Sequence, residues 1–413
     1  MKLISKIQEL KGKHIEKILK ITLLILVSFY FFWLPSFSDR SPFNYFTYPL
    51  LLLLTGICLI LLIVNKKVFI CREVIFILLA YLFFSLFSTL IHVRVLGLDG
   101  LREWLRLLFL FLSFFVLFNS FNIIYNKDRI IYALLIPLLL FAGYYLIIYF
   151  KDIIALFKGS DKRLGAYFNN VNTLSSFFAL GYLISFYQIF NLKKITRFVF
   201  ITFCALFIFL GYTTGSRQFL LSLFVSTFVF LIWKFRTKKA FLVTIIGLLI
   251  TSIVLIFTVP QLTFIRNKFL FLFDSADSKD LSAVQRLLMQ VNAIFEGGKN
   301  FVFGHGQLSF SFYTSFDGYS HNAFTNSFFE SGIIGLFCLI LLLTLILRNG
   351  AKLKDEYFGI IILLLVYYFI VGFFSVWFRE KPFYVSLSFM CFLIYEKNFK
   401  KEKVIQEMYS IDI

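Results

Sequence analysis

The stretch YFTYPLLLLLTGICLILLIV, residues 45–64, holds 20 residues without a single Asp, Glu, Lys or Arg. A helix of about 20 apolar residues crosses roughly 30 Å of hydrocarbon, and it bonds every backbone amide internally. The whole chain has the same character, because 60% of its 413 residues are hydrophobic, only 15% are charged and 60 are Phe. This composition is typical of a polytopic helical membrane protein and lies far outside the range of a soluble domain.

About twelve stretches, including the one at 45–64, have the length and hydropathy of a membrane span, the last only marginally. They lie near 21–38, 45–64, 74–93, 107–125, 130–150, 171–190, 198–214, 218–233, 240–259, 331–347, 357–378 and 383–395. We therefore expect an all-α protein with about twelve transmembrane helices. The first stretch resembles a secretory signal, with Ser36-Phe37-Ser38 as a cleavage site, but its apolar run is too long and a basic tail precedes it. We interpret it as a retained span.

Lysine and arginine residues concentrate in the N-terminal tail and in alternate connections between spans. They are Lys2, Lys6, Lys11, Lys13, Lys17, Lys20, Lys66, Lys67, Arg72, Lys193, Lys194, Arg197, Lys234, Arg236, Lys238 and Lys239. The positive-inside rule predicts that this face is cytoplasmic, with both termini inside and the long loop 260–330 outside. The net charge of +19 then reflects topology and anionic lipid headgroups, and it requires no nucleic acid.

The expected organisation is a cytoplasmic tail at 1–20, nine transmembrane helices in 21–259, an extracytoplasmic loop at 260–330, three transmembrane helices in 331–395 and a second tail at 396–413. The span interiors lack ionisable side chains and the two halves show no internal repeat, which disfavours a coupled transporter. The few His and Cys residues show no metal-ligand spacing, so we expect no metal and no cofactor. No cysteine pair is placed to bridge the outer loop.

Some basic residues oppose the positive-inside rule. On the expected outer face lie Arg94, Arg102 and Arg106, in one short connection between spans, and also Lys158, Lys162, Arg163, Arg217, Arg286, Arg379 and Lys381. A guanidinium group presents a planar fork of donors, which suits phosphate or diphosphate oxygens. The alternative for each is an arginine that reaches into the lipid headgroups.

Three of these arginines lie in distinctive local sequences. Arg163 begins RLGAYFNNVN (163–172), where Gly165, Asn169 and Asn172 suit a loop that dips toward the membrane; the alternative is a polar loop with Asn172 as helix N-cap. Arg217 ends the tight turn GYTTGSR (211–217).

Arg286 lies in a predicted amphipathic helix of the long loop. The helix begins with the capping box Ser282–Gln285 and stops at Gly297-Gly298, and its apolar residues recur at helical spacing. A helix lying on the membrane or on the spans would hold Arg286 at the interface. The alternative is a surface helix with a solvated arginine.

A polar patch with His321-Asn322 precedes the tenth span, and Glu330 lies at the mouth of that span. A neutral histidine accepts a proton from a hydroxyl, so His321 is a candidate general base. The alternative is a structural histidine. Glu330 competes as the base, although a carboxylate at a helix N-terminus is also favourable without any chemistry.

These pieces, in this order, resemble the bacterial superfamily of O-antigen ligases and O-antigen and capsule polymerases, which are membrane glycosyltransferases. The resemblance rests on Arg163 with Gly165, Asn169 and Asn172; on Gly215-Ser216-Arg217; on Arg286; on Gly304 and Gly306; and on His321-Asn322 with ESGIIG (330–335). The chain departs from the pattern at Asn170-Val171-Asn172, where many relatives have proline before the second Asn.

The resemblance implies a GT-C-like fold in the inner membrane and metal-independent, inverting transfer from a polyprenyl-diphosphate-linked oligosaccharide. It implies His321, Arg217 and Arg286 as catalytic residues. It further implies a substrate-binding set of Arg163, Arg379, Asn169, Asn172, Asn322 and Glu330. A chain-length regulator is a candidate partner, beside membrane lipids.

The sequence leaves three activities open. The form of the His321 and Glu330 motifs favours a repeat-unit polymerase of O-antigen, capsule or a related cell-envelope polysaccharide. The near alternative is a ligase that moves finished glycan onto lipid A core, as in lipopolysaccharide, or onto another acceptor. A glycolipid exporter without chemistry is a more remote alternative.

Overall fold

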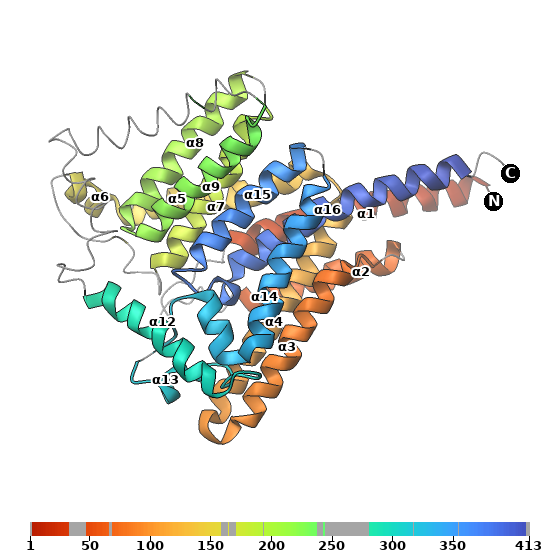
Figure 1. Cartoon of the computed structure of the whole chain (residues 1–413). Helices are drawn as coiled ribbons and strands as arrows, with labels where there is room; N and C mark the ends of the chain where they lie inside the picture. The colour runs from red at the N-terminus through yellow and green to blue at the C-terminus, as the bar shows by residue number, and fades with distance from the viewer. Residues whose placement is uncertain are drawn as a thin grey trace.

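The computed structural model describes residues 2–32, 47–65, 68–157, 164, 171–192, 194–237, 243, 281–316, 318–353 and 355–409. Within these ranges the chain is helical and contains no β-strand (Figure 1). The helices of the first half are α1 (Lys2–Phe32), α2 (Thr47–Asn65), α3 (Arg72–Ile91), α4 (Val93–Ile124), α5 (Lys127–Ile148), α6 (Phe150–Phe157), α7 (Val171–Ile189), α8 (Lys194–Thr213) and α9 (Arg217–Lys234). Those of the second half are α12 (Leu281–Lys299), α13 (Phe310–Tyr313), α14 (Ala323–Ala351), α15 (Asp355–Val371), the 3₁₀ helix η3 (Trp377–Arg379) and α16 (Lys381–Tyr409).

Five described helices are long and apolar enough to cross a membrane: α3, α4, α5, α8 and α14. Shorter apolar stretches occur in α2, α7, α9 and α15. The prediction of a helical membrane protein is therefore confirmed. The count of twelve spans stays a prediction, and the expected ninth span at 240–259 lies, apart from Val243, outside the described residues.

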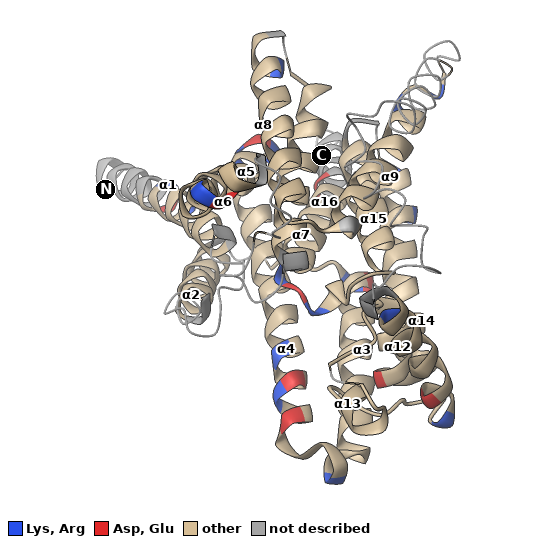
Figure 2. Ribbon diagram, turned by 90° about the vertical axis from the view of Figure 1, so that its left-hand side faces the viewer, with Lys and Arg blue, Asp and Glu red and all other residues tan. Residues whose placement is uncertain are grey.

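The prediction placed Arg94, Arg102 and Arg106 in a short connection, and this is wrong. These arginines lie in the first turns of α4, which begins at Val93 and bends at Gly97. Ion pairs at helical spacing, Asp99 with Arg102 at 2.9 Å and Glu103 with Arg106 at 3.4 Å, support these turns. Figure 2 shows the basic and acidic residues alternating along this part of α4.

The ends of four predicted helices also differ. α1 begins at Lys2, so the predicted N-terminal tail is helical, and α16 continues through most of the predicted C-terminal tail. α12 begins before Ser282 and runs through Gly297-Gly298 to Lys299, so these residues neither cap nor stop it. α7 begins at Val171, which places Asn172 inside its first turn rather than at the N-cap.

Neighbouring helices pack through aromatic side chains, and α9 and α15 run antiparallel. α9 lies against α15, where Phe230 and Trp233 pack over Gly359 and the Trp233 and Phe358 rings lie 5.3 Å apart. α3 packs on α14, and α4 packs on α16. α9 therefore begins at the same end of the bundle at which α15 ends. We call this the His321 end, because His321 precedes α14 there.

α14 begins eight residues before the predicted span and is broken at Gly332, whose φ is +67°. Glu330 thus lies buried just before a bend inside the helix, and the alternative that placed it at a helix N-terminus is wrong. A Cβ at Gly332 would overlap the backbone of Val302, and the positive φ disfavours any L side chain. Only glycine fits this position without strain.

We expect Gly332→Ala to destabilise the protein by roughly 1–3 kcal/mol or more, because the cost of a positive φ for alanine and the cost of the overlap between its Cβ and the Val302 backbone add. The matched control is Gly143→Ala in α5, where a Cβ meets nothing within 4 Å and helix propensity favours alanine. Thermal unfolding midpoints in detergent would measure both. Equal midpoints for the two variants would contradict the account of the bend.

Candidate active site at the His321 end of the bundle

The break at Gly332 frees backbone groups of α14 for a neighbouring loop. The carbonyls of Phe329 and Glu330 accept from the N–H groups of His305 and Gly306, each at 2.9 Å, and the N–H of Ile333 donates to Phe301 O at 2.8 Å. Backbone groups that a bent helix leaves unpaired must find partners when they are buried. The loop between α12 and α13 is therefore fixed against the broken part of α14.

A buried ion pair lies beside this contact. Glu330, with no exposed surface, accepts from Nη2 of Arg379 at 2.5 Å. The same Nη2 donates to Gln307 Oε1 at 2.9 Å. Glu330 also accepts from the Leu308 N–H at 3.2 Å and from Asn326 Nδ2 at 2.8 Å. Such dense hydrogen bonding offsets the cost of removing two charges from water.

The ion pair also contacts the first half of the chain. Glu103 on α4 lies 3.7 Å from Nη1 of Arg379, and Ser88 on α3 donates to the backbone carbonyl of Glu330 at 2.9 Å. Two carboxylates therefore face one guanidinium. The pair connects α3, α4, α14 and η3 at one point.

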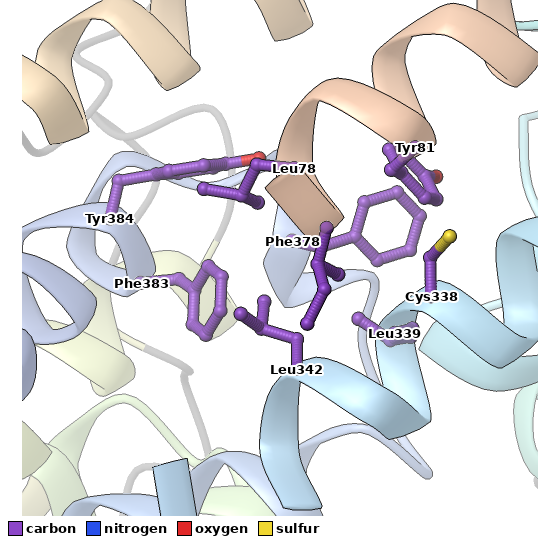
Figure 3. A pocket seen from close by; sticks show the side chains of 9 residues that line it. Leu78, Tyr81, Cys338, Leu339, Leu342, Phe378, Phe383 and Tyr384 are labelled. Atoms are coloured by element: carbon purple, nitrogen blue, oxygen red, sulfur yellow. The ribbon is translucent and has the colours of Figure 1, made fainter. Parts of the chain in front are cut away.

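The small cavity next to the pair is apolar (Figure 3). It measures about 20 Å³ and is lined by Ile77, Leu78, Tyr81, Cys338, Leu339, Leu342, Phe378, Phe383 and Tyr384, from α3, α14, η3 and α16. This volume holds about one water molecule. The cavity is too small and too apolar for a glycan or a diphosphate.

A polar junction on the other side of α14 positions His321. Asn322 caps α14, because its Oδ1 accepts from the N–H groups of Phe324 and Thr325 at 2.9 and 3.1 Å. Its Nδ2 donates to Gln290 Oε1 on α12 at 3.4 Å. Gln290 in turn donates to Phe373 O at 3.4 Å. The start of α14, α12 and the loop after α15 thus meet around His321.

His321 has an unusual backbone and an unusual environment. Its φ is +55°, a conformation that is uncommon for non-glycine residues and concentrates at functional sites. Burial and, second, the positive charge of Arg286 lower its pKa to about 4. The Tyr319 ring lies 4.6 Å from the imidazole. Arg286 therefore lies near enough to His321 for its charge to disfavour the imidazolium, and the lowered pKa favours a neutral imidazole at physiological pH.

The other two histidines of this region have structural contacts. His305 bonds Glu296 O through Nε2 at 2.9 Å and Asn300 Nδ2 through Nδ1 at 3.0 Å, which the neutral Nε2–H tautomer satisfies. Burial lowers its pKa. His92 bonds the Tyr313 hydroxyl through Nδ1 at 2.9 Å. His305 thus has both ring nitrogens occupied by the protein.

Two predicted arginine segments lie next to each other. The N–H of Leu164 donates to Thr213 O at 3.2 Å, and the Tyr145 hydroxyl bonds Thr213 Oγ1 at 3.1 Å. Leu164 follows Arg163, and Thr213 stands four residues before Arg217. Leu164 therefore lies against the end of α8, next to the turn that leads into α9.

The remaining predicted site residues are described only in part. Arg163, Gly165 and Asn169 lie outside the described residues, and the side chains of Asn172 and Arg217 are outside the described part of the chain. Arg217 is the first residue of α9. Their predicted roles stay predictions. Among the described residues, no group of three His, Cys, Asp or Glu side chains is placed to hold a metal ion.

Sequence reasoning missed three contributors: Glu103, Gln290 and Gln307. The charge of Glu103 was visible within an arginine-rich stretch, but its partner Arg379 lies far away in the chain. Gln290 and Gln307 carry no local signal, because an isolated glutamine in a polar loop or helix is ordinary. Only the fold shows that they contact Asn322 and Arg379.

An all-helical bundle of apolar helices is typical of a polytopic membrane protein, and the polar junction with its histidine and arginine at one end of the bundle is the candidate site. Residues 201–340, about a third of the chain, match the family model described as O-antigen ligase. This match supports an assignment to the O-antigen ligase and polymerase superfamily, in agreement with the resemblance seen in the sequence. A comparison of the chain with curated proteins finds no match.

The buried ion pair predicts strong coupling between its two members. Glu330→Gln or Arg379→Met alone should cost roughly 3–5 kcal/mol of unfolding free energy, because each leaves one buried charge uncompensated. The double variant should lose much less than the sum of the two. A double-mutant cycle on unfolding in detergent measures this coupling, and simple additivity would contradict the account.

Proposed function

We propose that the chain is a repeat-unit polymerase that transfers a growing glycan from polyprenyl diphosphate onto the next lipid-linked unit. The proposed location is the outer face of the bacterial inner membrane, with both termini cytoplasmic. The observation that carries the proposal is the meeting of Arg286 and His321 at one end of the bundle. Both residues lie within the stretch that matches the family model.

In this proposal His321 accepts the proton of an acceptor hydroxyl. The resulting oxygen attacks the anomeric carbon of the donor glycan, the bond from that carbon to the diphosphate oxygen breaks, and polyprenyl diphosphate leaves with the electron pair. In-line displacement inverts the configuration at the anomeric carbon. A neutral imidazole supports the role of His321, because only this form accepts a proton.

The arginines would stabilise the charge that grows on the leaving diphosphate. We assign this role to Arg286, Arg217 and Arg163, since fixed guanidinium groups in a site of low dielectric stabilise such charge by a few kcal/mol. Asn169 and Asn172 would bind the diphosphate or glycan beside Arg163. Asn322 would position His321 through its contact with Gln290.

Glu330 and Arg379 receive a different role. They were candidates for the general base and for a fourth diphosphate ligand, but they bind each other in a buried pair. We therefore propose that this pair positions α14 and η3, and we assign proton transfer to His321.

The same donor chemistry serves a ligase, so these residues do not separate the two activities. The polymerase is preferred on the form of the motifs His321-Asn-Ala-Phe-Thr-Asn and ESGIIG (330–335). The ligase, acting on lipid A core or another acceptor, is the second candidate, and the matching family model bears its description. An exporter without chemistry would need neither His321 nor the arginines for glycan transfer.

His321→Ala should abolish polymer formation and Arg286→Ala should reduce it by roughly a hundredfold or more, while protein level and membrane insertion stay normal. The matched control is Arg102→Ala at the same end of the bundle, whose side chain is 76% exposed and pairs with Asp99. The size distribution of lipid-linked and surface glycan is the measurement. Single repeat units without a ladder indicate a polymerase, whereas long chains stranded on the carrier indicate a ligase. Unchanged profiles in both site variants would overturn the enzyme proposal.

The pKa of His321 also predicts the pH profile. With a pKa of about 4, the imidazole stays neutral above that pH, so the acidic limb of kcat/KM should lie near pH 4 rather than near the usual histidine pKa of about 6.5. Arg286→Gln removes one cause of the lowered pKa, so the limb of its residual activity should move to higher pH. Arg286→Lys keeps the charge and should keep the limb in place. An acidic limb that does not move in Arg286→Gln would contradict this electrostatic coupling.

A further inference from the structure

α12 has two unlike faces, and the protein covers the less apolar one. Met289 and Ala293 are buried against α14, and a Cβ at Gly297 would touch Phe328 at the start of α14. Gln290, on the same side, makes the contact with Asn322. The contact of α12 with the rest of the protein is therefore formed by one methionine together with small and polar side chains.

The apolar stripe of α12 points away from the protein. Its six members are between 39% and 72% exposed: Val284, Leu287, Leu288, Val291, Ile294 and Phe295. At about 100° per residue, the centre of this stripe lies opposite the face formed by Met289 and Ala293. A helix on a water-soluble protein turns its apolar stripe toward the core, so this arrangement is reversed.

The reversed stripe continues into apolar surface of neighbouring helices. Phe301 and Val302, directly after α12, are about half exposed, and the Phe301 ring lies 5.8 Å from that of Phe328 on α14. Further along α14, Phe337 is 61% exposed. Because α14 is a candidate membrane span, its exposed apolar side chains face lipid, and the stripe is continuous with that lipid-facing surface.

The orientation of α12 also fits the surface of a bilayer. α12 lies against α14 and crosswise to the long axis of α3, which is itself a candidate span (Figure 1). Arg286 is the only charged residue between Leu281 and Phe295. Since Arg286 lies on the side near His321, the apolar stripe carries no charge.

We propose that the apolar stripe of α12 is buried among the acyl chains of the bilayer leaflet at the His321 end. The helix then lies in the interface with its less apolar side toward the protein and its apolar stripe toward the lipid, as in amphipathic interfacial helices. This arrangement places Arg286 and His321 at the boundary between headgroups and acyl chains. The inference concerns the position of α12, and it holds whether or not the chain transfers glycans.

The test places a fluorescent label on each side of α12 in the full-length protein in lipid nanodiscs. Cys71→Ser removes the one native cysteine that is not buried, and Leu287→Cys or Phe295→Cys then provides a site on the stripe for an NBD label. Gln285→Cys, exposed but off the stripe, is the matched control. Nanodiscs with lipids brominated on the acyl chains quench labels that lie among those chains.

We expect brominated lipid to remove most of the NBD emission at residues 287 and 295 and little of it at residue 285. The stripe residues make no contact with the protein core, so their substitution should leave folding intact, and the Cys71→Ser protein alone reports background labelling. Unquenched emission at a blue-shifted wavelength would mean that protein covers the stripe. Unquenched emission typical of water, or equal quenching at all three sites, would equally overturn the proposal.

Discussion

The ion pair between Glu330 and Arg379 is the constraint on which the His321 end of the bundle depends. Two charges with almost no exposed surface are stable only where geometry and hydrogen bonds offset their lost hydration. Here the offset comes from Gln307 and Leu308 in the loop before α13 and from Asn326 in α14. Moving any of these segments would leave a buried charge without partners. The pair therefore fixes where α14 bends and where the loop after α15 runs.

The candidate site follows from that arrangement. The bend at Gly332 separates a short first part of α14 from its membrane-spanning part, and Asn322 caps the first part. Gln290 bonds both Asn322 and the loop after α15, so α12 lies where Arg286 influences His321. A neutral imidazole beside a fixed guanidinium is suited to a reaction that takes a proton from a hydroxyl and releases an anion. α12, the helix that carries Arg286, turns its apolar stripe outward. This orientation would place the proposed chemistry at the level of a lipid-linked substrate.

Most helices and the arginine-bearing segments are predictable from the sequence, because membrane spans and interfacial arginines leave local signals in it. Uninterrupted apolar runs predicted the helices, and the spacing of Val284, Leu287 and Leu288 predicted α12. The direction in which that stripe faces could not be predicted, since periodicity shows that a helix has two faces but not which one the protein covers. The pairing of Glu330 with Arg379 was equally invisible, because it joins residues on either side of a helical hairpin. The density of charges in the first turns of α4 predicts a loop. The helical spacing of Asp99 with Arg102 and of Glu103 with Arg106 is the signal that points to the helix instead.

The most direct test of the central claim is reconstitution of the purified chain in lipid vesicles with a polyprenyl-diphosphate-linked oligosaccharide and a chelator of metal ions. The measured quantities are the polyprenyl diphosphate released and the length of the glycan. The account predicts that the wild-type chain releases the carrier and lengthens the glycan with inverted linkage, and that His321→Ala does neither. An intact substrate with the wild-type chain, or equal turnover by His321→Ala, would contradict it.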